Sequence, residues 1–187
     1  MMSYLKSYIK QQQDMRITYA TFMEIALYHP QFGYYMKEKT KIGKDGDFYT
    51  SSNVHNVYGK LFANLFHRLC IEEQMPPVIC EVGAGTGRFA EQVLSEWKES
   101  FPTFYEEVTY IIVETSPYHR KLQQERLPSD AKIVYYSSLE DVPPFKGVIF
   151  SNELFDALPV HVIVKKDGVL QEVFVSLEED QLVEVFA

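Results

Sequence analysis

The feature that most constrains this chain is a short passage that changes from strand to glycine-rich turn to helix. The apolar run Val78–Val82 follows two prolines, which favours a buried strand over a helix. A helical pattern begins at Phe89, and between the two lie three glycines on alternate positions, Gly83, Gly85 and Gly87. A strand that breaks into glycines and restarts as a helix leaves N–H groups unpaired. Because glycine has no Cβ, a ligand can approach such a backbone closely. The passage therefore predicts a ligand site at the end of a strand.

The spacing of the glycines argues against a phosphate ligand. It is G-x-G-x-G rather than the G-x-G-x-x-G of a dinucleotide site, because Arg88 stands where the third glycine would be. A pyrophosphate needs that position small and the helix N-terminus free. Glu81 adds negative charge at the end of the strand, which suits a cationic or amino-bearing ligand better. The alternative is a tight turn that needs glycine for positive φ and binds nothing.

Composition excludes several classes of function. The 187 residues carry a formal net charge of −8, so general attraction to nucleic acid is not expected. The chain contains no apolar run long enough to span a membrane and no signal-peptide pattern. Its two cysteines, Cys70 and Cys80, form neither a disulfide framework nor a zinc site. We therefore expect a cytoplasmic protein with no metal, no nucleic-acid partner and no membrane partner.

Apolar periodicity predicts an alternation of helices and strands. Helices are expected over residues 1–28, with Thr18 or Thr21 as an N-cap, and then over 57–73, 89–97 and 117–126. Core strands are expected at residues 78–82, 108–113, 132–136 and 147–152. Further strands are expected at 160–164, 169–176 and 182–186, because Asp167-Gly168 is a signal for a type I′ hairpin.

This order predicts an α/β fold with a doubly wound parallel sheet. We expect an N-terminal helical extension over residues 1–75, which carries a Gly-Asp-Phe loop. Residues 76–187 are expected to form a ligand-binding α/β domain that ends in a β-hairpin. Only four core strands precede that hairpin. The sheet is therefore expected to be incomplete at the C-terminus, with an open edge along the strand at 147–152.

Acidic and amide side chains stand where two of the core strands end. Glu114 follows the strand at 108–113, on the edge of the sheet where ligands of open α/β folds bind, and a carboxylate there can accept hydrogen bonds from two ribose hydroxyls. Asn152 ends the strand at 147–152, Glu153 and Asp156 follow it, and carboxylates at this place can hold a planar guanidinium. The alternatives are a plain exposed acid for Glu114 and helix capping for Glu153 and Asp156.

Four motifs, in this order, resemble the MidA family of methyltransferase-like proteins: A-L-Y-H-P-Q-F-G-Y-Y, G-D-F-Y-T-S, E-V-G-A-G-T-G and S-N-E-L-F-D-A-L-P-V. The third motif by itself resembles the nucleotide-binding motif of class I S-adenosylmethionine-dependent methyltransferases. The resemblance runs from about Thr18 to about Val162 and matches the N-terminal part of longer relatives. It implies a Rossmann-like methyltransferase sheet with S-adenosylmethionine as cofactor. Since the family includes a complex I assembly factor that methylates an arginine, it also implies a protein arginine substrate.

The resemblance and the positions together assign candidate residues. The cofactor is expected to contact Gly46, Thr50, Glu81, Gly83, Ala84, Gly85, Gly87, Glu114, Ser138, Leu139 and Asn152. The transfer is expected to depend on Asp47, Asn152, Glu153 and Asp156. Asn53 stands where the family usually has Glu, which leaves the substrate open. Two alternative functions remain: a small-molecule methyltransferase, and a non-catalytic assembly or scaffold protein with the same fold. A homodimer is a possible oligomeric state.

Overall fold

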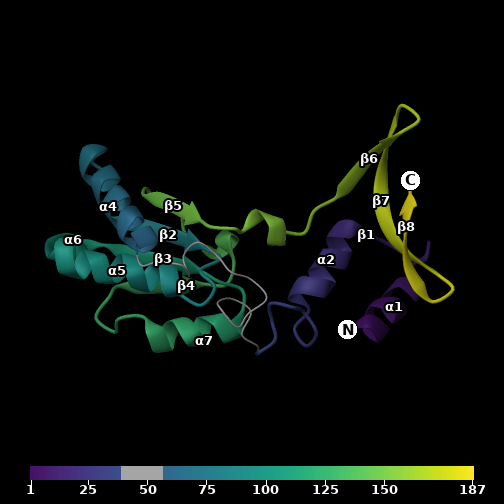
Figure 1. The fold of residues 1–187 in the computed structure, drawn as a ribbon, viewed down its shortest axis with the longest axis horizontal. Coiled ribbons are helices and arrows are strands. Elements are labelled where there is room, and N and C mark those ends of the chain that lie inside the picture. Colours follow the sequence, from purple (N-terminus) through teal and green to yellow (C-terminus); the bar gives the residue numbers. More distant parts are fainter. Residues whose placement is uncertain (39–56) are drawn as a thin grey trace. The chain divides into compact units, whose positions relative to one another are not determined.

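The structure, a computed structural model, describes residues 1–38 and 57–187 and divides the chain into two compact units. The central unit comprises Glu38–Leu154, and the terminal unit combines Met1–Lys37 with Phe155–Ala187 (Figure 1). Neither unit coincides with the predicted domains 1–75 and 76–187. Among the described helices, none combines the length and apolar character that a membrane crossing requires.

The central unit is built on a parallel sheet of four strands in the order β4-β3-β2-β5. The strands are β2 Val78–Val82, β3 Thr109–Val113, β4 Ile133–Tyr136 and β5 Val148–Ser151. The chain therefore moves outward from β2 to β3 and β4, then returns to the other side of β2 with β5. This is the doubly wound order that the sequence predicts. Its switch point, where ligands of such folds bind, lies between β2 and β5.

Helices pack against one face of this sheet and form the main core with it. They are α4 Val57–Glu72, α5 Arg88–Ser100, α6 Pro102–Glu107 and α7 Pro117–Arg126. Trp97 of α5 and Tyr110 of β3 are fully buried in this core. Helix α4 approaches α5 closely because Gly59 has no side chain: a Cβ there would lie 2.3 Å from Gln92 Cβ. Gln92 Oε1 also accepts the Gly59 N–H at 3.2 Å, which satisfies a donor in the first turn of α4.

The other face of the sheet carries a smaller apolar cluster. Cys80, Ile111 and Val113 are buried there, with Val142 and Phe145 packed against them. The register places Ile149 of β5 beside Cys80, but Ile149 is 61% exposed. Within the described residues β5 pairs with β2 alone.

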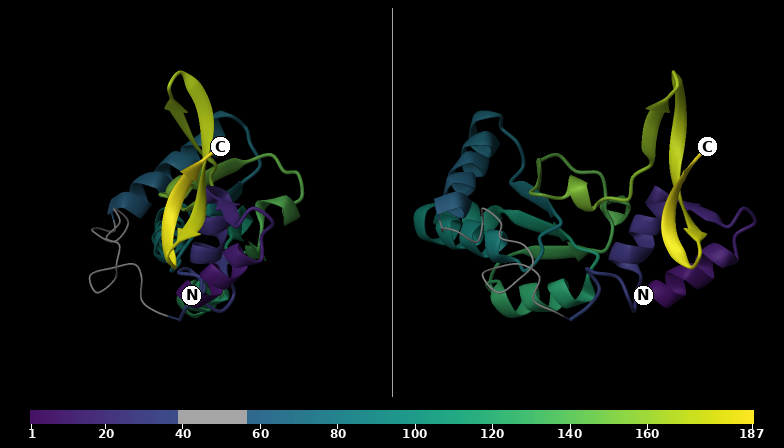
Figure 2. Two further views of the ribbon diagram at one scale, coloured as in Figure 1. Left: turned by 90° about the vertical axis from the view of Figure 1, so that its right-hand side faces the viewer. Right: turned by 45° about the vertical axis from the view of Figure 1, so that its right-hand side comes forward.

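The terminal unit is an antiparallel sheet packed on two helices. Strand β7 Val169–Glu178 pairs with β1 Arg16–Thr18, β6 Val162–Lys166 and β8 Gln181–Phe186, and the helices are α1 Met2–Lys10 and α2 Tyr19–Tyr28 (Figure 2). Asp167 and Gly168 have φ of 51° and 83°, which confirms the predicted hairpin signal. Thr18 caps α2 as predicted, because its Oγ1 accepts the Thr21 N–H at 3.1 Å. A helix through the whole of residues 1–28 is wrong, however, since β1 interrupts it and buries Ile17 against β7.

Candidate functional site

The glycine loop between β2 and α5 has left-handed backbone geometry at all three of its glycines. Their φ values are 77°, 53° and 76° for Gly83, Gly85 and Gly87, a region that side chains with a Cβ rarely adopt. The N–H of Gly83 donates to Val113 O at 2.8 Å, and the N–H of Gly87 donates to Ala84 O at 3.0 Å. The N–H of Gly85 donates to the Glu114 carboxylate at 3.0 Å. The prediction of unpaired N–H groups is therefore wrong for these three residues, whose donors serve the protein itself.

The space left by two missing Cβ atoms is also used by the protein. A Cβ on Gly83 would lie 2.9 Å from Leu154 Cδ1, and a Cβ on Gly87 would lie 2.9 Å from Gln123 Cγ. The glycines at both positions are thus required by backbone conformation and by packing. Leu154 also brings the segment after β5 directly against the loop.

Glu114, at the end of β3, joins the loop to the start of α7. Its Oε2 accepts the Gly85 N–H, and its Oε1 accepts the Ser116 N–H at 2.9 Å. His119 Nδ1 lies 3.7 Å from this Oε2, and Glu114 as a whole is 8% exposed. An ionised carboxylate offers about four acceptor positions. Two are occupied here, which leaves two for a pair of vicinal hydroxyls, so this donor and acceptor arrangement fits the ribose of an adenosyl cofactor.

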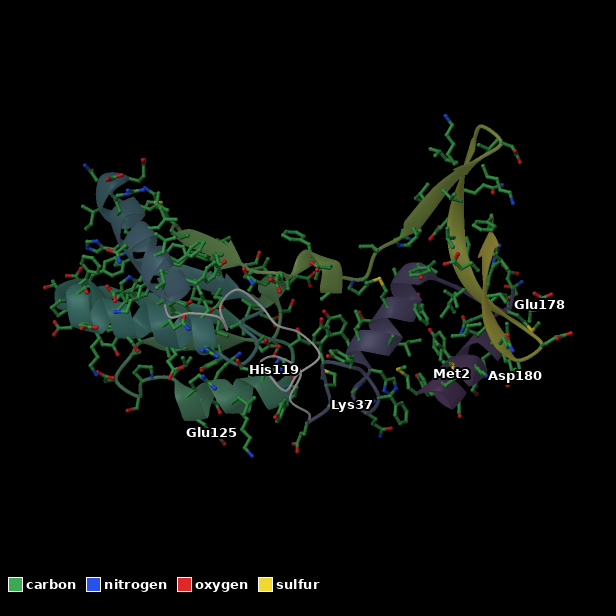
Figure 3. The ribbon with its side chains drawn as sticks, in the orientation of Figure 1. Met2, Lys37, His119, Glu125, Glu178 and Asp180 are labelled. Carbon is green, nitrogen blue, oxygen red and sulfur yellow. The ribbon has the colours of Figure 1, made fainter. Side chains whose placement is uncertain are left out.

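Helix α7 turns a polar stripe toward the loop. Ser116 caps the helix by accepting the His119 N–H, and Gln123 Nε2 donates to Gly85 O at 2.7 Å. Ser116, His119 and Gln123 are all buried, whereas Glu125 on the same helix is exposed. Of these residues, Figure 3 labels His119 and Glu125. Sequence reasoning missed this stripe because polar helix positions usually face solvent. The spacing of Ser116, His119 and Gln123, three and then four residues, was the signal that could have placed them on one face of the helix.

Glu81 is a nearly inaccessible acid at the carboxyl end of β2. It is 4% exposed, and the Tyr110 hydroxyl donates to its Oε2 at 2.8 Å. Burial raises the pKa of Glu81 to about 7; the hydrogen bond from Tyr110 opposes this shift, and the charge of Glu114 adds to it. A carboxyl group of this kind is only partly ionised at neutral pH and is stabilised in its charged form by a nearby cation.

The segment after β5 carries an amide and an acid in a constrained geometry. The Tyr58 hydroxyl, from the first turn of α4, donates to Asn152 Oδ1 at 2.8 Å. Burial raises the pKa of Tyr58, and the charge of Glu153 raises it further, so this hydroxyl stays protonated as a donor. Glu153 has φ of 50°, which is uncommon for a residue with a side chain and often accompanies function. Sequence reasoning missed Tyr58, because its partner Asn152 is distant in the chain and the helix at 57–73 carries no site signal of its own.

The remaining candidate residues belong to several different parts of the chain. Ala84 is part of the loop and is 8% exposed. Ser138 follows β4 and caps η1 Leu139–Asp141, so that Leu139, which is 49% exposed, begins that turn. Asp156 belongs to η2 Phe155–Ala157 in the terminal unit. Gly46, Asp47, Thr50 and Asn53 lie outside the described residues.

A separate cavity lies in the terminal unit. It measures about 350 Å³ and is bordered by Tyr8, Arg16 and Phe174, with the Arg16 guanidinium 4.5 Å from the centre of the Phe174 ring. None of the described candidate residues lines it. The central unit therefore brings together Glu81, the glycine loop, Glu114 and the Asn152–Leu154 segment, at the strand ends where an open α/β sheet binds its ligand.

Comparison with known proteins identifies the family of the chain. A family model described as "Putative S-adenosyl-L-methionine-dependent methyltransferase" matches residues 58–186. A Drosophila melanogaster relative, named protein arginine methyltransferase NDUFAF7 homolog, mitochondrial, is 31% identical over 189 residues, with 86% of this chain and 41% of the relative covered. The human protein arginine methyltransferase NDUFAF7, mitochondrial, is 27% identical over 190 residues, with 87% and 42% covered. The chain thus spans about two fifths of the length of these curated relatives.

Solved structures show the same fold. A Burkholderia thailandensis structure bound to S-adenosyl-homocysteine matches with a TM-score of 0.86 and 26% identity, covering 100% of this chain and 49% of that one. One prediction is contradicted: the chain was expected to be cytoplasmic, whereas the relatives from fly, zebrafish and human are named mitochondrial. The MidA-like fold and the family resemblance are confirmed. Because the family model covers well over half of its residues, the chain belongs to the family of S-adenosyl-L-methionine-dependent methyltransferases that this model describes.

Proposed function

We propose that this chain binds S-adenosylmethionine and takes part in methyl transfer to a protein arginine. The observation that carries the proposal is the placement of Glu114, whose carboxylate is held by the N–H groups of Gly85 and Ser116 at the carboxyl edge of the sheet. Family membership and the S-adenosyl-homocysteine in a structural neighbour support the cofactor. The names of the relatives support arginine as the acceptor.

The cofactor, when bound, supplies a methyl group on a positively charged and already activated sulfonium. The residues of the chain then have to align donor and acceptor and exclude water. Glu114 accepts hydrogen bonds from the ribose hydroxyls, and the buried Glu81 favours the positive charge of the ligand. Ser138 and Leu139 are assigned to the adenine, on their position after β4.

On the acceptor side, we assign Asn152 and Glu153 to the guanidinium. Its planar N–H groups match the paired acceptors of a carboxylate. We also assign to Glu153 the role of accepting the proton that the nitrogen releases on methylation. Four further assignments remain sequence-based predictions: Gly46, Asp47, Thr50 and Asp156. The absence of nucleic-acid and membrane partners and the formation of a homodimer also remain predictions.

Calorimetry with S-adenosylmethionine and S-adenosyl-homocysteine tests the cofactor assignment. We expect both to bind, and a dissociation constant weaker than ~1 mM, about −4 kcal/mol, for both would contradict the assignment. The Glu125→Ala variant, altered at an exposed position of α7, is the control and should bind normally.

Transfer of a labelled methyl group to proteins of a cell lysate tests the acceptor. We expect the label in methylarginine after acid hydrolysis of the protein fraction. Label in small molecules instead would favour a small-molecule methyltransferase. Cofactor binding without any transfer would favour an assembly or scaffold role.

A further inference from the structure

We propose that Gln123 is a positioning residue for the cofactor site, which it serves by holding the glycine loop in its binding conformation. The inference rests on the proposed function and extends it to a helix that carries none of the predicted contacts. Gln123 lies on α7 and is 0% exposed. Its Nε2 donates to Gly85 O at 2.7 Å, and its Cγ packs where a Cβ of Gly87 would otherwise stand.

Gly85 is thereby held from two sides. Its carbonyl accepts from Gln123, while its N–H donates to Glu114 Oε2 at 3.0 Å. With φ of 53°, this residue has a conformation that an unrestrained chain leaves readily. Fixing the Gly85 peptide fixes the donor that orients the Glu114 carboxylate. Gln123 therefore acts on the ribose-binding acid through Gly85, without any contact with the cofactor of its own.

The other end of the same carboxamide indicates that stability alone does not explain this residue. Gln123 Oε1 is buried and has no hydrogen-bond partner among the described residues. A buried, unpaired acceptor destabilises a folded protein, and an apolar side chain of similar shape would avoid that cost.

The Gln123→Met variant separates a positioning role from a packing role. Methionine keeps the length of the side chain and the contact with Gly87, but it removes both the Nε2 donor and the unpaired Oε1. If Gln123 only fills space, the affinity for S-adenosyl-homocysteine should stay unchanged, or fall only together with the melting temperature where methionine packs less well. If it positions the loop, the melting temperature should stay equal or rise, while the affinity falls about 3- to 10-fold, the effect of one neutral hydrogen bond.

A second readout needs no ligand. Amide hydrogen exchange of Gly85 in the free protein should be faster in Gln123→Met than in the unaltered chain. In the variant the Gly85 carbonyl no longer accepts a hydrogen bond from residue 123, so the residue opens more readily. Gln124→Met is the matched control, since Gln124 is the next residue of the same helix and is exposed. This control should leave the melting temperature, the affinity and the exchange rate unchanged.

The outcomes distinguish this inference from the proposed function. Failure of the unaltered chain to bind S-adenosyl-homocysteine would contradict the proposed function, and the exchange rate of Gly85 would still decide the role of Gln123. Unchanged exchange and unchanged affinity in Gln123→Met would overturn the inference. So would a parallel loss of melting temperature and affinity. Should the Met variant not fold, Gln123→Leu also removes the Nε2 donor and keeps an apolar side chain that suits a helix. We expect it to lose affinity about 3- to 10-fold and to speed the amide exchange of Gly85; normal affinity with normal exchange would overturn the inference.

Discussion

The Tyr110 hydroxyl donates a 2.8 Å hydrogen bond to the Glu81 carboxylate, across the two central strands of the parallel sheet. Both side chains are almost completely buried. Burial raises the pKa of Glu81 to about 7, and burial together with the charge of Glu81 raises the pKa of Tyr110 well above its usual range. Tyr110 therefore remains the donor, while Glu81 changes its charge near neutral pH.

Glu81→Gln should change how stability depends on pH. The folded-state pKa of Glu81 lies above its ordinary value of 4.5, so its contribution to stability is present below pH 4.5 and is lost as the pH rises through about 7. Glutamine does not titrate. The free energy of unfolding of the variant, relative to the unaltered chain, should thus increase by roughly 2–4 kcal/mol between pH 4.5 and 8. Denaturant titrations at several pH values measure this difference. A difference that is constant with pH would show that Glu81 is ionised throughout, and Glu125→Gln at an exposed position is the control.

Cofactor binding should also depend on the charge of Glu81. A cationic sulfonium near this carboxylate stabilises the ionised form, so the affinity for S-adenosylmethionine should rise several-fold from pH 6 to pH 8, with release of protons on binding at pH 6. S-adenosyl-homocysteine has no sulfonium charge and should show a weaker trend. Calorimetry in buffers of different ionisation enthalpy measures the protons released. Equal trends for the two ligands would place the sulfonium away from Glu81.

Glu114→Ala should reduce the affinity for the cofactor much more than it perturbs the fold. The variant loses the acceptor for two ribose hydroxyls, and a hydrogen bond to a charged group contributes about 1.5–3 kcal/mol, so we expect affinity to fall about 10- to 100-fold. The N–H groups of Gly85 and Ser116 lose their acceptor as well, and their amide exchange should become faster. Glu125→Ala is the control for a carboxylate removed from the surface of α7. Unchanged affinity in Glu114→Ala would show that the ribose assignment is wrong.

Much of the central unit could be predicted because its signals are local. The strand β2 and the helix α7 begin and end at the residues that periodicity, prolines and caps indicate. The doubly wound order followed from the alternation of strands and helices, and in the terminal unit the hairpin followed from Asp167-Gly168. These features depend on neighbouring residues in the chain, which is why one sequence was sufficient.

The failures concern contacts between distant segments. Strand β1 was not predicted because the burial of Ile17 depends on its pairing with Val175, far along the chain. Gln123 was not predicted as part of the site because its partner, Gly85, lies on another element, and a polar residue on a helix usually faces water.

Tyr58→Phe should reduce methyl transfer without reducing cofactor binding. The variant keeps the ring, which lies 4.9 Å from that of Phe62, and removes only the hydroxyl that holds Asn152 Oδ1. Loss of one neutral hydrogen bond is worth about 0.5–1.5 kcal/mol, so transfer should slow about 2- to 10-fold, with an unchanged affinity for S-adenosyl-homocysteine. Tyr135→Phe, on β4, is the control for loss of a tyrosine hydroxyl. A normal transfer rate in Tyr58→Phe would show that Asn152 does not need this restraint.

Gly83→Ala and Gly168→Ala separate the two reasons for a glycine at position 83. Both residues have positive φ, 77° and 83°, so each substitution should cost about 1–2 kcal/mol from backbone strain. A Cβ on Gly168 meets nothing within 4 Å, whereas a Cβ on Gly83 lies 2.9 Å from Leu154 Cδ1. Gly83→Ala should therefore destabilise the protein more, and it should also slow methyl transfer, because Leu154 adjoins Glu153 on the acceptor side. In a double-mutant cycle, Leu154→Ala should relieve part of the effect of Gly83→Ala on unfolding. Additive effects in that cycle would mean that backbone strain alone requires glycine at position 83.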